Sequence, residues 1–236
     1  VDVHAENVSS REVSGDFYDV VSAGDGTLLL TIADVSGKGV PAALLSSMLQ
    51  ASLRTQAVSA VSPAAMMTIV NRMACDRGTT GQFATLFLAA VDERAMTLRY
   101  TNAGHNFPVL LRGDGRRMLL EDGGLLVGML PAAEYAEGRV MLKPGDRLVL
   151  YTDGVTEAVD ANGVMFGEER LYAMLESLPL DLTARGIVER VLSAVRGFLD
   201  EIEPGDDITV MAMRVMEDGP GRPDVRPDPR VDPILR

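Results

Sequence analysis

Residues 28–43 read LLLTIADVSGKGVPAA, and this stretch decides the fold. The run from Leu28 to Ala33 is short, apolar and ends in Asp34, which is typical of a buried strand. Two glycines follow, and a helical pattern then begins at Pro41, a residue suited to the first turn of a helix. A carboxylate therefore ends a rigid strand at a place where backbone can approach a ligand closely.

Helix pairs and strands alternate outward from this stretch. The apolar spacing of Leu45, Met48, Leu49 and Leu53 predicts a helix over 41–57, and Ser62-Pro63 predicts the start of a second helix. Further helices are expected over 168–178 and 183–202, and further strands over 84–91, 96–102, 147–152 and 208–215. This order of elements predicts an α+β layered sandwich.

Composition narrows the class of protein. The 236 residues include 22 Lys and Arg against 34 Asp and Glu, a net charge of −12 that disfavours nucleic acid as a partner. Apolar residues make up 47%, which excludes wholesale disorder, and no apolar run reaches the roughly 18 residues of a membrane span. Cys75 is the single cysteine, so an intrachain disulfide is excluded and a cytoplasmic location is expected.

One domain is expected over residues 1–216. From Glu217 onward the sequence EDGPGRPDVRPDPRVDPILR is rich in Pro, Arg and Asp, which predicts a disordered tail or linker over 217–236. The chain starts inside an expected strand at Val1, so we expect that a sensory domain or linker helix precedes this segment in the parent protein.

Acidic residues beside glycines recur at the ends of expected strands. Four segments share this pattern: Ser14–Asp19, Ala33–Gly39, Tyr151–Gly154 and Pro204–Thr209. Each segment alone is compatible with an ordinary turn. Several carboxylates brought together would repel one another, and oxygen ligands without nearby His or Cys favour Mg²⁺ or Mn²⁺ over Zn²⁺. The four segments together therefore predict a divalent metal site.

These segments carry a resemblance to a known family. The motifs are GDFYD at 15–19, ADVSGKGVPAA at 33–43, NAGHN at 102–106, LVLYTDGVTE at 148–157, FG at 166–167 and GDDIT at 205–209. In this order they resemble the SpoIIE/RsbU branch of the metal-dependent (type 2C, PPM) serine/threonine protein phosphatases. The resemblance implies a four-layer αββα sandwich with two central antiparallel sheets.

The resemblance also implies a centre of two Mn²⁺ or Mg²⁺ ions. By motif position, Asp34 would bridge the ions and the Val35 carbonyl would bind one of them. Asp153 and Asp206 would complete one site and Asp16 the other, with Asp207 ranked below Asp206. Metal-activated water would attack phosphoserine or phosphothreonine directly, so no covalent nucleophile is needed. The position where eukaryotic relatives carry a candidate acid is Ser36, and no general acid is assigned.

Partners and regulation follow from the same resemblance. The implied substrate is a phosphorylated anti-sigma-factor antagonist of the STAS type, in a bacterial stress or sigma-factor pathway, and a homodimer would be in keeping with related domains. Lys38 is a candidate contact for substrate phosphate. Leu45, Met48 and Leu49 lie on a helix that would couple an upstream sensory domain or partner protein to the metal site.

Two other functions remain open. The first is a catalytically silent sensor or scaffold of the same fold, which the presence of Asp34, Asp153 and Asp206 disfavours. The second is a Ca²⁺-stabilised structural domain, which is weaker because no EF-hand spacing occurs.

Overall fold

The computed structural model describes residues 1–10, 14–24, 26–57, 62–77, 81–200 and 202–216. The tail expected at 217–236 lies outside the described residues. Within them, no helix has both the length and the apolar character that crossing a membrane requires.

Two β-sheets form the centre of the domain. The first has the strand order β1 (Asp2–Val8), β11 (Ile208–Arg214), β10 (Arg147–Tyr151), β6 (Val109–Leu111) and β7 (Arg117–Leu119). The second has the order β2 (Phe17–Ser22), β3 (Thr27–Val35), β4 (Ala84–Asp92), β5 (Thr97–Ala103) and β8 (Gly123–Gly124), and β9 (Gly138–Met141) pairs with β5. All these pairings are antiparallel except the short one between β5 and β8, which is parallel.

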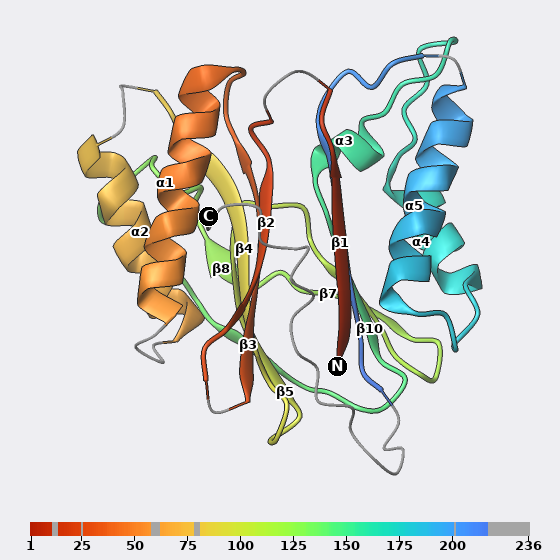
Figure 1. The fold of residues 1–236 in the computed structure, drawn as a ribbon, viewed down its shortest axis with the longest axis horizontal. Helices are drawn as coiled ribbons and strands as arrows, with labels where there is room; N and C mark the ends of the chain where they lie inside the picture. The colour runs from red at the N-terminus through yellow and green to blue at the C-terminus, as the bar shows by residue number, and fades with distance from the viewer. Residues whose placement is uncertain (11–13, 25, 58–61, 78–80, 201, 217–236) are drawn as a thin grey trace, which may run out of the picture.

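Helices cover the outer face of each sheet. The helices are α1 (Val40–Ala57) and α2 (Pro63–Arg77) on the second sheet, and α4 (Glu168–Ser177) and α5 (Ala184–Leu199) on the first. The four-residue helix α3 (Asp153–Thr156) follows β10 directly. Figure 1 shows the resulting order of layers, with the two sheets between the helix pairs. The expected αββα sandwich is confirmed, with the β5–β8 pair as its one parallel departure among the described strands.

Alternation along the strands builds three apolar layers. In β3, Leu29 and Ala33 face α1 and α2, whereas Leu30 and Ile32 face the other sheet. Because both faces are covered, β3 is apolar almost throughout, as its sequence predicted. On α5, the stripe that includes Ile187 packs against the first sheet, and the Thr183 hydroxyl caps the helix by accepting from the Gly186 N–H at 3.1 Å.

The sequence predictions of the long elements agree closely with the structure. The helix predicted over 41–57 spans 40–57, and the one predicted over 183–202 spans 184–199. On α1, Leu45, Leu49 and Leu53 are buried, while Met48 is partly buried. The short strands β6 to β9 were not predicted, since strands of two to four residues carry too little periodicity to be recognised.

Candidate functional site

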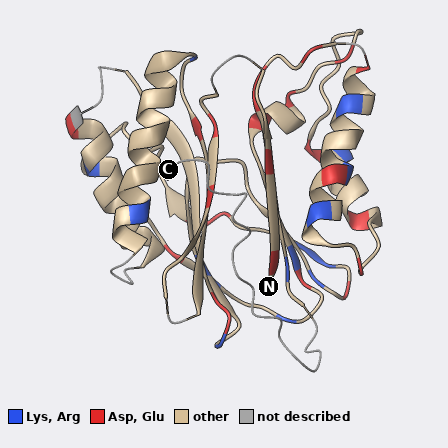
Figure 2. Cartoon of the chain, in the orientation of Figure 1, with Lys and Arg blue, Asp and Glu red and all other residues tan. Residues whose placement is uncertain are grey.

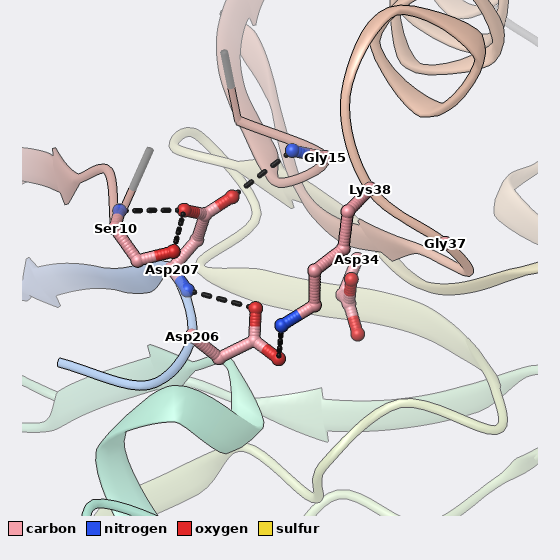
Figure 3. Close-up of a pocket in the computed structure, with 7 residues that line it drawn as sticks. All are labelled: Ser10, Gly15, Asp34, Gly37, Lys38, Asp206 and Asp207. Atoms are coloured by element: carbon pink, nitrogen blue, oxygen red, sulfur yellow. Dashed lines mark hydrogen bonds and ion pairs between the residues drawn. The ribbon is translucent and has the colours of Figure 1, made fainter. Parts of the chain in front are cut away.

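One end of the sandwich gathers the predicted acidic residues. Asp34 is the last residue but one of β3, Asp153 begins α3 soon after β10, and Asp206 lies two residues before β11. Asp16 immediately precedes β2. Antiparallel strands from both sheets end here, so segments far apart in sequence meet around a small hollow, drawn in Figure 3.

Burial and mutual repulsion act on these carboxylates. Asp16 is 8% exposed, and burial raises its pKa well above the usual range, with the Asp34 charge adding to the rise. Burial likewise raises the pKa of Asp34, and the charges of Asp153 and Asp206 raise it further. The pKa of Asp153 is raised by burial first and then by the charges of Glu157 and Asp206. The site therefore concentrates negative charge that a cation would stabilise.

Lys38 supplies one positive charge to this hollow. Its Nζ lies 3.2 Å from Asp206 Oδ2 (Figure 3). It also donates to the Gly205 carbonyl at 3.3 Å. Gly37 and Gly39 flank it with φ angles of 94° and 78°, a region that favours glycine, so the two glycines shape the turn that presents Lys38. Among the residues lining the hollow, Lys38 is the one cation.

Asp207 is engaged differently from Asp206. Its Oδ1 accepts from the Ser10 N–H at 2.7 Å and the Ser10 hydroxyl at 3.0 Å. Its Oδ2 accepts from the Ser14 hydroxyl at 2.7 Å and the Gly15 N–H at 3.0 Å. Burial alone would raise the pKa of Asp207, but the hydrogen bonds from Ser14, Ser10 and Gly15 outweigh burial and hold that pKa below its usual value. Asp207 thus ties the segments before β2 to the start of β11.

Gly15 brings backbone close to the predicted carbonyl ligand. A Cβ atom at Gly15 would lie 3.1 Å from the Val35 carbonyl oxygen, a tight contact that glycine avoids. The neighbouring Ser14 hydroxyl accepts from the Asp16 N–H at 3.1 Å while it donates to Asp207. Ser14 therefore helps to place the Asp16 backbone.

The residues present fit a hard divalent cation by the chemistry of their donors. All candidate ligands are carboxylate or carbonyl oxygens, which suit Mg²⁺ and Mn²⁺. Asp16 and Asp34 form no ion pair with any residue that the structure describes. In the described ranges, however, no three Asp, Glu, His or Cys side chains converge closely enough to hold an ion as they stand. The hollow is about 10 Å³ in volume, and Lys38 already holds Asp206.

His105 has a structural environment. Its side chain is 3% exposed, its Nδ1 lies 2.8 Å from the Thr85 hydroxyl, and its backbone N–H donates to Asn102 Oδ1 at 2.7 Å. Gly104 before it has a φ of 69°, which closes the turn at the end of β5. Burial lowers the pKa of His105 to about 4, so the imidazole is neutral at pH 7.

Sequence reasoning missed several polar residues that support the site. The Thr209 hydroxyl donates to Asp16 Oδ2 at 2.7 Å, and the Thr209 N–H donates to the Thr152 hydroxyl at 3.0 Å. Both threonines are fully buried. The only signal in the sequence was a threonine beside each acidic motif. Threonine is common in strands, so its presence there does not indicate a role in a site.

An ion pair between an exposed arginine and a buried aspartate connects α1 to the second sheet. Arg54 donates from Nε to Asp19 Oδ2 at 2.7 Å and from Nη2 to Asp19 Oδ1 at 2.9 Å. Asp19 is 6% exposed and lies in the middle of β2. No strand was predicted at this position, and the partner lies 35 residues away in the chain, so no local pattern indicated the pair.

Comparison with known proteins shows which family this sequence resembles. The sequence matches the family described as Stage II sporulation protein E (SpoIIE) over residues 24–216. Protein IcfG of Synechocystis sp. is 30% identical over 232 residues, covering 86% of this chain and 36% of that protein. Phosphoserine phosphatase RsbU of Bacillus subtilis is 28% identical over 215 residues, covering 91% of this chain and 63% of that protein. The chain thus spans less than two thirds of either relative.

The solved structures agree on the fold. The PP2C phosphatase domain of SpoIIE from Bacillus subtilis superimposes with a TM-score of 0.80 at 21% identity, covering 93% of this chain and 63% of that one. The fold is therefore that of a PP2C-type phosphatase domain, with its carboxylates at one end of the sandwich. From the sequence match and this fold together, the chain belongs to the SpoIIE family.

Proposed function

We propose that the domain is a metal-dependent protein serine/threonine phosphatase acting in sigma-factor regulation. One observation carries the proposal, namely the convergence of Asp16, Asp34, Asp153 and Asp206 from four separate segments into a partly buried site with raised pKa values. Membership of the SpoIIE family and the similarity to a relative named phosphoserine phosphatase support it.

The ligand assignment is part of the proposal. Asp34 would lie between two Mn²⁺ or Mg²⁺ ions, the Val35 carbonyl would bind one ion, Asp153 and Asp206 would serve one site, and Asp16 the other. Such ions, when bound, lower the pKa of a shared water and offset charge on the phosphoryl group. Asp207 was expected as a further ligand. Because both its oxygens already accept hydrogen bonds, we assign it the role of positioning the segment that carries Asp16.

The chain's own residues then bind and orient the substrate. Lys38 Nζ would donate to phosphate oxygens, since this side chain is partly exposed and reaches over the hollow from its glycine-flanked turn. The short contact between Lys38 and Asp206 would be exchanged for a contact with phosphate. We place the substrate among phosphorylated STAS-type anti-sigma-factor antagonists in the cytoplasm. The regulator of the domain would be an upstream sensory domain or a partner protein.

Helix α1 is proposed as the regulatory element. It begins at Val40, directly after the Lys38 turn, and Leu45 and Leu49 pack it against the second sheet, with Met48 at the margin of that core. A shift of α1 would therefore move Lys38 relative to Asp206. Leu49→Ala removes core packing, whereas Met48→Ala changes only the edge of that core. If Met48→Ala lowers activity without changing the free energy of unfolding, coupling between α1 and the acidic site is supported. If activity in both variants falls only in proportion to stability, α1 has no switching role.

Hydrolysis of a chromogenic phosphate ester tests the proposed activity. The wild-type chain should hydrolyse the ester with Mn²⁺ and lose activity with a chelator. Asp34→Asn and Asp153→Asn should abolish turnover, while Glu189→Gln, an exposed change on α5, should not. Activity that survives chelation, or that persists in Asp34→Asn, would contradict the metal mechanism.

A silent domain of the same fold is the competing function. The Lys38–Asp206 ion pair favours it, because the lysine neutralises a candidate ligand without a metal. Calorimetric titration with Mn²⁺ separates the two. A silent, lysine-neutralised site would neither bind Mn²⁺ in wild type nor gain turnover with any divalent metal, whereas the proposed enzyme binds Mn²⁺ and loses that binding in Asp34→Asn.

A further inference from the structure

A second surface feature lies at the opposite end of the sandwich from the acidic site. A groove of about 600 Å³ opens between the turn after β6 and the turn before β10. Arg147, at the start of β10, pairs with Leu111 at the end of β6, whereas Asp153 follows the other end of β10. The two features are thus separated by the five-residue length of β10, roughly 16 Å.

Basic side chains form the walls of this groove. Arg112, Arg116, Arg117 and Lys143 all line it, in a chain whose net charge is −12. Figure 2 shows Lys and Arg positions grouped on the strands and turns at this end of the first sheet. Arg116 is 77% exposed in its side chain, and Lys143 is exposed and makes no ion pair with any residue that the structure describes.

Asp146 joins the two turns that form the groove and neutralises Arg112, and Arg117 pairs with Glu176 at 2.9 Å. Arg116 and Lys143 are therefore the cations on the rim that a ligand can reach. Asp146 is 1% exposed, and it accepts from Arg112 at 2.6 Å, from the Lys143 N–H at 2.9 Å and from the Gly113 N–H at 3.3 Å. These bonds join the two turns that form the walls. The other lining acid, Asp114, is exposed and pairs with Arg116 inside one turn, a contact that contributes little and is easily exchanged.

The floor of the groove is apolar and lies between two sheet edges. Met118 comes from β7, the last strand of the first sheet, and Met141 comes from β9, which borders β5 in the second sheet. They are 38% and 56% exposed, so two apolar side chains are open to a ligand here. Methionine is flexible and adapts to varied apolar partners. Among the described strands, β7 lies at the edge of the first sheet, and an edge strand can pair with an extended chain.

We propose that this groove binds an extended, acidic peptide segment of a partner protein. Carboxylates of the peptide would pair with Arg116 and Lys143 on the rim, and an apolar side chain between them would pack on Met118 and Met141. Charge complementarity supports this occupant. The chain as a whole repels an acidic partner, whereas the cations on the rim of this groove attract one and so direct it here. A compact phosphate ligand fits less well, because an apolar floor gives it no contact.

Fluorescence anisotropy with the full chain tests this docking. The probe is a short labelled peptide in which Glu and Asp alternate with Leu, compared with a counterpart carrying Lys in place of the acids. The acidic peptide should bind, more weakly as salt rises, and the basic one should not. Arg116→Glu combined with Lys143→Glu should weaken binding by at least about ten-fold. Met141→Ser should weaken it by a smaller factor.

The control has the same change of net charge elsewhere. Arg185→Glu combined with Arg190→Glu reverses two exposed cations on α5, outside the groove, and should leave binding within about two-fold of wild type. Hydrolysis of the chromogenic ester should be equal in both double variants and in wild type, so this test is independent of the acidic site. Circular dichroism confirms folding.

Three outcomes would overturn the proposal. One is equal loss of peptide binding in the groove and α5 double variants, which would show only long-range attraction. Another is equal binding of the acidic and basic peptides. The third is absence of peptide binding. The proposal also fails if ATP, tested as a small anion, binds in a way that Lys143→Glu abolishes while the peptide does not bind.

Discussion

Replacing Asp207 should destabilise the domain far more than replacing its neighbour Asp206. Asp207 accepts two backbone N–H bonds and three hydroxyl bonds, the longest of them from Ser9, and is 8% exposed. A hydrogen bond to a charged group contributes about 1.5–3 kcal/mol, and a buried donor left unpaired costs about 1–3 kcal/mol. Allowing for water entering at the part-buried side, Asp207→Ala should lower the free energy of unfolding by about 3 kcal/mol.

Asp206 is the matched control within the same pair. Its carboxylate is 54% exposed, is 3.2 Å from Lys38, and is repelled by Asp34. Asp206→Ala should therefore change stability by less than about 1 kcal/mol while abolishing the proposed activity. Asp207→Asn should lie between these variants, at about 1.5 kcal/mol, because its amide can still pair with Ser10 and Ser14 but turns a donor toward the Gly15 N–H.

Urea unfolding, followed by circular dichroism without added metal, measures all three variants. Metal is omitted because metal binding would itself stabilise the folded state. A variant that binds metal less well would otherwise lose stability for a reason unrelated to hydrogen bonds. The assignment of Asp207 as a positioning residue is refuted if Asp207→Ala loses less than about 1 kcal/mol, or if Asp206→Ala loses as much as Asp207→Ala.

Three further predictions concern the supporting structure. Arg54→Ala should lower the free energy of unfolding in urea by about 1–2 kcal/mol, because Arg54 is the bidentate partner of the buried Asp19. A double-mutant cycle with Asp19→Ala should show coupling between the two, and additive losses would contradict this. Gly123→Ala should prevent folding or cost more than about 3 kcal/mol, since its Cβ would clash with the Asn102 backbone carbonyl in β5. Gly197→Ala, at an exposed position of α5, should raise the thermal midpoint. His105 has a pKa of about 4 when folded against an ordinary 6.5, so the folded state is favoured above pH 6.5 and loses stability as pH falls from there toward 4. Between about pH 7.5 and about pH 5, wild type should lose about 2 kcal/mol more than His105→Gln, and parallel pH profiles would contradict the burial of a neutral imidazole.

The long elements and the acidic segments could be predicted because their signals are local. The apolar run before Asp34 and the stripe from Leu45 to Leu53 identified β3 and α1 to within a few residues. The β6–β7 hairpin could not be predicted, because Arg117–Leu119 has neither length nor alternation, and its place at a sheet edge depends on pairing with β6.

The roles of individual acids were predicted less well. Asp206 and Asp207 are adjacent and chemically identical, yet one is held by an exposed lysine and the other by the Ser10 and Gly15 N–H groups. That difference comes from a segment 192 residues earlier in the chain, which no local pattern reports. The basic groove escaped prediction for the same reason, since Arg116 and Lys143 come together only through the turns that Asp146 joins.

The order of apolar runs, glycines and acids by itself predicted a layered α+β sandwich whose strands end in carboxylates, because periodicity and turn chemistry act over a few residues. The two central sheets were implied by the family resemblance. Tertiary structure alone decided which carboxylates are buried, which are neutralised by Lys38 or by backbone N–H groups, and which cations gather at the far end of the sandwich. Burial and Coulomb interactions depend on distances in space, and these distances are set only when strands from both ends of the chain pair.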